Sequence, residues 1–429
     1  MPRTDYLIIG AGIVGLSTAY HLKLEDPDAS ILVVDKAPGP GGGDTSKSAA
    51  AFRVFFTNRI NFSLAHASVS FYRDVQMGGW DLQMRWVGYL FVADDRMMER
   101  LKPGLSWADK HGLNYEVLEP GVLEERLGLR VNVEGLEEAE LMGAHNVVGG
   151  VLVRDAGVLM PDRLVSYYYE WLRSHNVSFA FNSRVRGFIL KPRRPLGIEG
   201  EPFPWQDTRV EGVELDDGTI IEAGKKTIVA TGAWTPYLLN PIGVDSYSRP
   251  KKRQIFTVKA DTPEKRKALY AKGFNREGVS PMIILPNGAY MRPAPEEEAY
   301  WTGYSDELGR PFQLEEPPVP EERFYTYTLH PMISLYMPAF EGSTPASSWA
   351  GHYDLSFDGM PVIFEAFDSD LIVSAGTSGS GILKGDAIGS VTAAVALERD
   401  TVTLYTGETL KTEWLGLTGR LMEKEYLII

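Results

Sequence analysis

The sequence predicts an α/β protein in which a discontinuous domain with a parallel central sheet is interleaved with an α+β domain that has an antiparallel sheet. Three short apolar runs carry this prediction, because continuous apolar segments are typical of buried parallel strands. They lie near the beginning, middle and end of the 429-residue chain, at 6–9, 227–230 and 371–375. The two intervening blocks, 86–151 and 249–344, mix strand and helix patterns.

A chain of this length is too long for one ordinary core, so the strand signals are grouped into two domains. The parallel strands must come together although they are far apart in the sequence. We therefore assign the first domain to 1–85, 152–248 and 345–429. The second domain then consists of 86–151 and 249–344.

The first apolar run is followed at once by a glycine-rich turn. Gly10-Ala11-Gly12-Ile13-Val14-Gly15 leads into a helical pattern to about Lys23, and the next apolar run, 31–34, ends on Asp35. Strand, turn, helix and strand in this order form a βαβ unit. The glycines permit the turn, the approach of a pyrophosphate and helix packing, and Asp35 would accept hydrogen bonds from ribose hydroxyls. The pattern predicts a Rossmann-like dinucleotide site; a glycine turn with a packing role only is the alternative.

The elements after Asp35 follow from local patterns. A loop is expected at 39–43 and a helix at 45–56, and Pro161 begins a helix that ends at Ser174. The turn Asp216-Asp217-Gly218 joins two strand patterns and predicts a hairpin. The last apolar strand runs into Gly376-Thr377-Ser378-Gly379-Ser380-Gly381, and a helix to Leu397 follows.

Composition excludes several function classes. The 57 acidic and 43 basic side chains give a net charge of −14, which disfavours binding to nucleic acids and anionic membranes. The absence of cysteine excludes disulfides, thiolate metal sites and cysteine nucleophiles. The seven histidines form no i,i+4 pair, so we expect no metal site. Without a signal-peptide pattern or an apolar span of membrane length, we expect a cytoplasmic protein, and the lack of cysteine with 27 prolines suits a thermophile.

Parallel-strand signals scattered along the chain favour an FAD domain over the usually contiguous NAD domain. The glycine turn, Asp35, Thr231-Gly232-Ala233-Trp234, Trp349-Ala350-Gly351-His352-Tyr353 and the 376–381 loop resemble the D-amino-acid oxidase (glutathione-reductase-type) flavoprotein superfamily. The resemblance covers essentially the whole chain and implies FAD as the cofactor.

The glycine turn and this resemblance together assign a set of residues to the cofactor site. The set is Gly10, Gly12, Ile13, Val14, Gly15, Asp35, Lys36, Thr45, Ser46, Lys47, Ser48, Val185, Thr231, Gly232, Trp234, Gly351, Tyr353, Gly379, Ser380, Gly381, Ile382, Leu383 and Lys384.

The resemblance also implies catalytic residues. Lys384 matches the lysine that binds the substrate carboxylate in the sarcosine-oxidase branch, and a surface lysine is the alternative. Arg53 resembles a substrate-side arginine, with a structural ion pair as the alternative, and Arg292 falls where relatives place a carboxylate-binding residue. His352 and Tyr353 fall where the family directs side chains at the flavin; core packing is the alternative.

One position departs from the family pattern. Sarcosine-oxidase-like members carry a lysine near the flavin just before a Gly-Tyr pair, and it assists oxygen reduction. The corresponding stretch here is Tyr300-Trp301-Thr302-Gly303-Tyr304, with tryptophan in that place. The substitution favours a dehydrogenase over an oxidase.

Within the superfamily, the motifs at 44–53, 249–253 and 351–354 look most like archaeal dye-linked L-proline dehydrogenases. This likeness implies oxidation of L-proline to Δ1-pyrroline-5-carboxylate, with hydride transfer from Cα to flavin N5 and a quinone or dye as electron acceptor. A sarcosine, dimethylglycine or other N-methyl amino acid oxidoreductase is the alternative among enzymes. A Rab-escort-like binding module without flavin chemistry is the alternative outside them.

Two segments have no role in this scheme. A proline-rich insert, Pro192 to Pro204, carries Phe203 and is followed by Trp205; it is either a solvated loop or a contact in a homodimer. The chain ends in a charged run and four apolar residues, 423–429, which would form an exposed patch if free in water. We expect this tail to complete an edge strand or to close over the substrate cavity.

Overall fold

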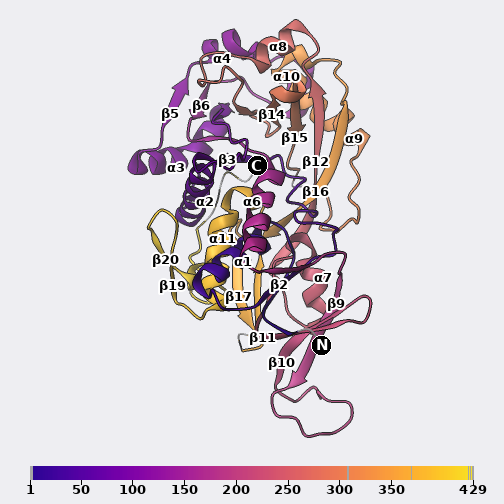
Figure 1. Cartoon of the computed structure of the whole chain (residues 1–429). Helices are drawn as coiled ribbons and strands as arrows, with labels where there is room; N and C mark the ends of the chain where they lie inside the picture. Colours follow the sequence, from indigo (N-terminus) through magenta and orange to yellow (C-terminus); the bar gives the residue numbers. More distant parts are fainter. Residues whose placement is uncertain (1–2, 307–308, 369, 424, 426, 428–429) are drawn as a thin grey trace.

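Three strands from distant parts of the sequence lie side by side in the first sheet (Figure 1). In the computed structural model, which describes residues 3–306, 309–368, 370–423, 425 and 427, β11 (Ile220–Val229) pairs in parallel with both β1 (Arg3–Ile9) and β18 (Leu371–Ala375). β1 also pairs in parallel with β2 (Ile31–Val34). The discontinuous parallel sheet predicted from the apolar runs is therefore confirmed.

The complete first sheet has the order β17-β18-β11-β1-β2-β8, and the hairpin strands β10 and β9 extend it beside β11. The first half of β11 pairs antiparallel with β10, whereas its second half runs parallel to β1. The second strand of the predicted hairpin and the predicted middle strand are therefore one continuous strand. The strands not yet bounded are β8 (Ser178–Ala180), β9 (Val185–Pro192), β10 (Thr208–Leu215) and β17 (Val362–Ala366).

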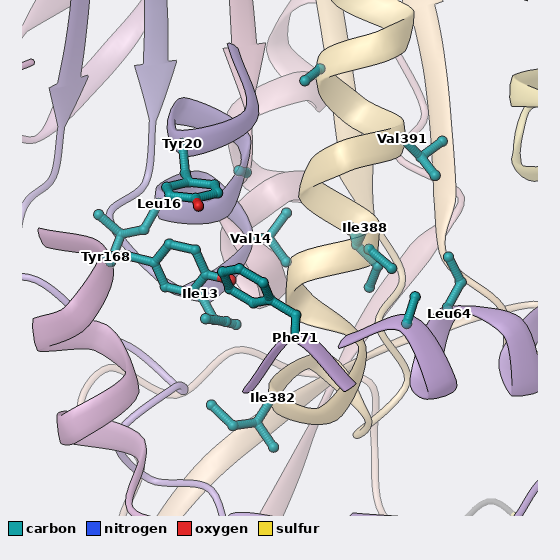
Figure 2. Packing of buried hydrophobic residues seen from close by; sticks show 14 of the residues in the cluster. Ile13, Val14, Leu16, Tyr20, Leu64, Phe71, Tyr168, Ile382, Ile388 and Val391 are labelled. Atoms are coloured by element: carbon teal, nitrogen blue, oxygen red, sulfur yellow. The ribbon is translucent and has the colours of Figure 1, made fainter. Parts of the chain in front are cut away.

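Four helices pack together beside this sheet, two of them directly on its strands. They are α1 (Ile13–Glu25), α2 (Arg59–Met77), α6 (Pro161–Ser174) and α11 (Gly381–Ala396). Their buried side chains, including Ile13, Tyr168 and Ile388, form one core (Figure 2). α11 approaches α1 closely because a Cβ at Gly385 would lie 2.4 Å from Ile13 Cγ1. This contact holds the N-termini of both helices beside the carboxyl ends of the strands, where ligands of open α/β sheets bind.

The second sheet has the order β16-β12-β15-β14-β13-β4-β6-β5 and is antiparallel except where β13 runs parallel to β4. Its strands are β4 (Tyr89–Ala93), β5 (Tyr115–Leu118), β6 (Gly149–Val153), β12 (Ser248–Lys259), β13 (Met282–Ile284), β14 (Tyr290–Ala294), β15 (Ala299–Gly303) and β16 (Ser347–Ser356). β16 falls within the segment assigned to the first domain, yet it pairs with β12 along ten residues. The chain therefore passes from the second sheet back to the first after β16.

The remaining elements are short or lie outside the two sheets. The helices are α3 (Asp95–His111), α4 (Pro120–Leu127), α5 (Glu137–Met142), α7 (Thr235–Leu239), α8 (Pro263–Leu269), α9 (Glu322–Phe324), the π-helical turn η4 (Tyr325–Leu329) and α10 (His330–Tyr336). Five 3₁₀ turns are η1 (Gly232–Trp234), η2 (Asn240–Ile242), η3 (Pro295–Glu297), η5 (Pro338–Phe340) and η6 (Thr412–Leu415). Two small sheets pair β3 (Ala51–Arg53) with β7 (Ala156–Val158) and β19 (Thr401–Thr403) with β20 (Thr409–Lys411). Within the described ranges, no helix combines the length and the apolar character needed to cross a bilayer.

The helix predicted at 45–56 is wrong. Residues 44–47 form turns, and β3 follows because Ala51 to Arg53 pair with β7. Side-chain hydroxyls compete with a helix here: Thr45 Oγ1 accepts a hydrogen bond from Ile13 N, and Ser48 Oγ accepts one from Ala50 N. These bonds hold the segment against the glycine turn, so it does not form a helix.

Candidate functional site

One long cavity of about 660 Å³ runs between the two sheets. One end is lined by Asp35 and Val185 from the first sheet and its turns. The other end is lined by Tyr89 and Tyr290 of the second sheet and by Lys384 of α11. The cavity is thus formed by both domains, with the N-termini of α1 and α11 along its length.

The glycine turn leaves a space along the cavity wall, here called the glycine cradle, that side chains at these positions would fill. A Cβ at Gly10, whose φ is +107°, would lie 2.3 Å from Ala230 O, and one at Gly12 would lie 3.2 Å from Thr45 Oγ1. Gly15 packs against the turn, since its Cβ would lie 1.9 Å from Gly10 O. Gly15 therefore has the predicted packing role and does not line the cavity, whereas Gly10 and Gly12 do.

Asp35 stands at the carboxyl end of β2, as the sequence predicts. Its Oδ2 accepts a hydrogen bond from Ala11 N at 2.6 Å, and its Oδ1 accepts one from Ala37 N at 2.8 Å. These bonds fix the carboxylate at the cavity edge, beside the glycine turn. The geometry suits the ribose end of a dinucleotide.

The outer mouth of the cavity carries an ionic cluster. Lys36 Nζ lies 3.8 Å from the centre of the Trp234 ring and pairs with Glu316, which Arg184 also contacts at 3.0 Å. Although burial raises it, hydrogen bonds from Lys36 and Arg184 lower the pKa of Glu316 to about 2. Trp234 Nε1 is buried at the cavity wall without a hydrogen-bond partner in the described structure, which fits a polar ligand along this wall.

The last glycine loop lies beside the N-terminus of α11. Gly379 has a φ of +77°, and a Cβ there would lie 2.3 Å from the Tyr353 ring. Thr377 at the start of the loop is held by the buried Asp354, whose Oδ2 accepts a hydrogen bond from Thr377 N at 3.1 Å. The loop and β16 therefore form one wall of the cavity, with Tyr353 on Gly379.

The inner end of the cavity holds two buried cations. Lys384 is 1 % exposed, and its Nζ donates to Asn61 Oδ1 at 2.6 Å. Arg53 is also buried and donates to the carbonyl oxygens of Phe55 and Leu427. Both cationic groups lie over the Phe56 ring, at 4.7 Å for Lys384 Nζ and 4.2 Å for Arg53 Cζ. Burial lowers the pKa of Lys384 to about 7 against the attraction of Glu425.

Two residues of the C-terminal tail complete this end. Glu425 accepts hydrogen bonds from Thr57 Oγ1 at 2.7 Å and from Leu427 N at 2.9 Å, and Asn61 Nδ2 donates to it at 3.3 Å. Both Glu425 and Leu427 line the cavity and are buried. Neither belongs to a strand, so these described tail residues cover the cavity and do not extend a sheet. Residues 424, 426, 428 and 429 lie outside the described residues.

The structure brings most of the predicted residues to the cavity. Gly15 and Ser46 are the two members of the cofactor set that do not line it. His352 lines the cavity, and its Nε2 accepts a hydrogen bond from Glu315 N at 3.1 Å. Arg292 does not line it: its guanidinium donates to the carbonyl oxygens of Leu159 and Pro293 and stacks on Trp301 at 4.1 Å.

Several lining residues escaped the sequence analysis. Asn61 and Glu425 belong to no cofactor or substrate motif, and their role depends on contacts with Lys384 and with the tail. Arg253 of β12 belongs to the 249–253 motif but was not predicted as a site residue; it also lines the cavity, over the Tyr353 ring at 5.0 Å. Tyr290 shares a strand face with Arg292, so strand alternation could have identified it as a companion of that residue.

A comparison with protein families identifies the family of the chain and its cofactor. The model described as FAD dependent oxidoreductase, DAO, matches residues 5–395. The chain belongs to the DAO family of FAD-dependent oxidoreductases. FAD is the cofactor, and the glycine cradle, Asp35 and the orphaned Trp234 Nε1 fit it.

Relatives of known name cover nearly the whole chain at low identity. "FAD-dependent oxidoreductase domain-containing protein 1" of Xenopus laevis is 23% identical over 92% of this chain and 79% of its own length. "Glycine oxidase" of Bacillus licheniformis is 23% identical over 96% of both chains, and "Monomeric sarcosine oxidase" of Bacillus sp. (strain B-0618) is 19% identical over 92% of both.

Solved structures share the fold of this DAO-family chain. L-proline dehydrogenase from P. horikoshii superposes with a TM-score of 0.74 at 20% identity, covering 97% of both chains. Glycine oxidase from Geobacillus kaustophilus gives 0.70 at 18% identity, covering 94% of this chain and 96% of its own. These likenesses establish the architecture, and the site residues carry the argument about chemistry.

Proposed function

We propose that this DAO-family protein is an FAD-dependent dehydrogenase that oxidises L-proline to Δ1-pyrroline-5-carboxylate and passes the electrons to a quinone or dye. The observation that carries the proposal is the inner end of the cavity, where Lys384 and Arg53 lie buried over one aromatic ring. Buried cations are costly unless an anion compensates them. A substrate carboxylate is the anion that a small amino acid supplies.

The walls of this end suit a compact apolar body next to the carboxylate. Phe56, Tyr89, Tyr290 and Tyr353 line it together with Met282. Aromatic side chains exclude water and pack against an apolar ring, but they offer little to a charged side chain. A five-membered ring attached to one carboxylate and one amine matches this combination. The fold it shares with L-proline dehydrogenase from P. horikoshii supports the same substrate.

Each group has a defined task in this scheme. When bound, FAD supplies at its N5 the acceptor for the hydride that leaves the substrate Cα. Lys384 and Arg53 hold the carboxylate by charge-assisted hydrogen bonds and so fix the orientation of Cα. The buried aromatic walls keep water out and favour the neutral amine, whose lone pair is needed as hydride leaves. His352 and Tyr353 line the wall of β16 and limit how the substrate can turn.

Anaerobic reduction of the bound flavin tests the proposal. The holoprotein is mixed with L-proline, D-proline, sarcosine, N,N-dimethylglycine or glycine, and the loss of visible flavin absorbance is followed. L-Proline should reduce the flavin at least tenfold faster than the others, since it alone combines the ring, the secondary amine and the L configuration. Faster reduction by sarcosine or glycine would refute the proline assignment while leaving the oxidoreductase class intact.

A sarcosine or dimethylglycine oxidoreductase is the second candidate. The carboxylate clamp would serve any α-amino acid, and the relatives include a protein named monomeric sarcosine oxidase. The aromatic walls favour the larger proline ring, because a sarcosine methyl group would leave part of the apolar surface without contact. A Rab-escort-like binding module would not need buried cations beside a flavin. Only isolation of the protein without bound flavin would favour that alternative.

A further inference from the structure

An acidic side chain lies beside the two buried cations at the inner end of the cavity. Glu425 lines the cavity with Arg53 and Lys384 and is itself 6 % exposed. Its carboxylate receives hydrogen bonds from a hydroxyl, an amide side chain and a backbone N–H, contributed by Thr57, Asn61 and Leu427. These three donors hold the carboxylate in place beside the cations.

Neither buried cation has an acidic partner at ion-pair distance within the described ranges. Lys384 bonds to the amide oxygen of Asn61, and Arg53 bonds to two backbone carbonyl oxygens. Glu425 acts on them at longer range: burial lowers the pKa of both groups, and the attraction of Glu425 opposes this lowering. Arg253, another cation on the cavity wall, is instead paired with Asp306 at 3.3 Å.

The charges at this end therefore do not cancel without a ligand. Among the described residues, Lys384 and Arg53 in their charged forms and the carboxylate of Glu425 leave a single positive charge in a buried space. One ligand carboxylate balances it, whereas a second ligand carboxylate would meet Glu425 in surroundings where like charges repel strongly.

We propose that Glu425 is a specificity-determining residue, which makes this end of the cavity accept monocarboxylate ligands and reject dicarboxylates. The proposal rests on the proposed function in one respect, namely that Lys384 and Arg53 bind the ligand carboxylate. Glu425 also acts as a positioning residue, because its bond to Asn61 Nδ2 directs the Asn61 oxygen at Lys384. Its carboxylate thus sets both the net charge and the orientation of the amide that holds the lysine.

A matched pair of unreactive ligands separates the charge effect from shape. Tetrahydro-2-furoate has the proline ring with oxygen in place of the amine, and cis-tetrahydrofuran-2,5-dicarboxylate adds one carboxylate to the same ring. Their dissociation constants are measured on the FAD holoprotein from the perturbation of the flavin absorption spectrum, so no turnover is required. In the wild type, the monocarboxylate should bind at least tenfold more tightly than the dicarboxylate.

Two substitutions of Glu425 test whether its charge is responsible. Glu425→Gln keeps the shape and removes the charge, so the preference for the monocarboxylate should shrink by about ten- to a hundredfold, the range of one charge-assisted contact. Glu425→Asp keeps the charge and should retain most of the preference. The flavin content and melting temperature of both variants show whether the tail still covers the cavity.

Three results would overturn the proposal. An unchanged preference in Glu425→Gln would mean that the carboxylate does not select the ligand. Equal loss in the Gln and Asp variants would mean that the tail acts through shape and not through charge. If neither ligand binds the wild type, the cationic end is no carboxylate site, and the proposed function fails as well. If L-proline reduces the flavin but Glu425→Gln keeps the full preference for the monocarboxylate, only the role of Glu425 is refuted.

Discussion

Replacing Lys384 by methionine removes one of the two charges assigned to the substrate carboxylate. Methionine keeps the length and the packing of the stem against Phe56, but it cannot donate a hydrogen bond. A charge-assisted hydrogen bond contributes about 1.5–3 kcal/mol. Its loss corresponds to a decrease of roughly ten- to a hundredfold in kcat/KM for L-proline.

The same change should not destabilise the fold. It leaves Asn61 Oδ1 without its lysine partner, which costs about 1–3 kcal/mol for a buried acceptor. It also removes a fully buried ammonium group that lies near a second cation, and this relief acts in the opposite direction. The two effects are of similar size, so the melting temperature of the holoprotein should stay within a few degrees and the flavin should remain bound.

The assay compares the rate of anaerobic flavin reduction by L-proline and by prolinamide, which lacks the carboxylate. Lys384→Met should slow the reaction with L-proline and leave the reaction with prolinamide nearly unchanged. Lys265→Met is a matched control, because Lys265 is also buried but pairs with Asp261 away from the cavity. Full kcat/KM of Lys384→Met on L-proline would refute the clamp and leave the carboxylate to Arg53.

Four further predictions follow from the same structure. Because burial lowers the pKa of Lys384 to about 7, its ammonium form is lost as the pH rises through this value; tetrahydro-2-furoate should then bind up to about tenfold more weakly per pH unit, and Lys384→Met should abolish this dependence. A dissociation constant independent of pH in the wild type would contradict it. The resemblance aligns Trp301 with the family's oxygen-activating lysine, and on that basis turnover with a dye should far exceed turnover with air; comparable peroxide production would reject this. Removal of Ile428 and Ile429, beyond the cavity-lining Leu427, should raise KM for L-proline at an unchanged melting temperature. Lost stability with unchanged kinetics would show that the tail is only structural. In the insert between β9 and β10, which projects from the molecule (Figure 1), Trp205 is 72% exposed and stacks on Phe203; if this surface is a dimer contact, Trp205→Glu should convert a homodimer to a monomer in sedimentation experiments. A protein with the same sedimentation as the wild type would assign the insert to solvent.

The cofactor end of the cavity was predictable because its signals are local in the sequence. Gly10, Gly12 and Asp35 belong to one βαβ unit, so a short stretch of chain specifies their relative positions. The helix expected at 45–56 failed for the converse reason. Thr45 Oγ1 accepts a hydrogen bond from the glycine turn and β3 pairs with β7, and neither contact is visible in local propensity.

The substrate end was only partly predictable because it is assembled from distant segments. Lys384 and Arg53 came from family resemblance, and the structure places both at the cavity. Arg292 came from the same source, but in this chain its guanidinium bonds to the carbonyl oxygen of Leu159 and lies against Trp301. Glu425 lies 364 positions from its partner Asn61, and no periodicity or spacing connects two such residues before the fold is known.

The position of Lys384 is hard to explain by stability alone. It lies in the first turn of α11, where the helix dipole disfavours a cation, and it is buried near Arg53. Each of these three conditions opposes a charged lysine, and leucine or methionine would pack there without the cost. A buried cation that destabilises the fold is best explained by ligand binding. Proteins retain such unfavourable charges at sites where a bound ligand of opposite charge compensates them. In the proposed function the substrate carboxylate provides this relief, and the proposed role of Glu425 is to leave one positive charge, not two, before the substrate binds. Under this proposal, Lys384, Arg53 and Glu425 together leave one positive charge for the ligand to neutralise.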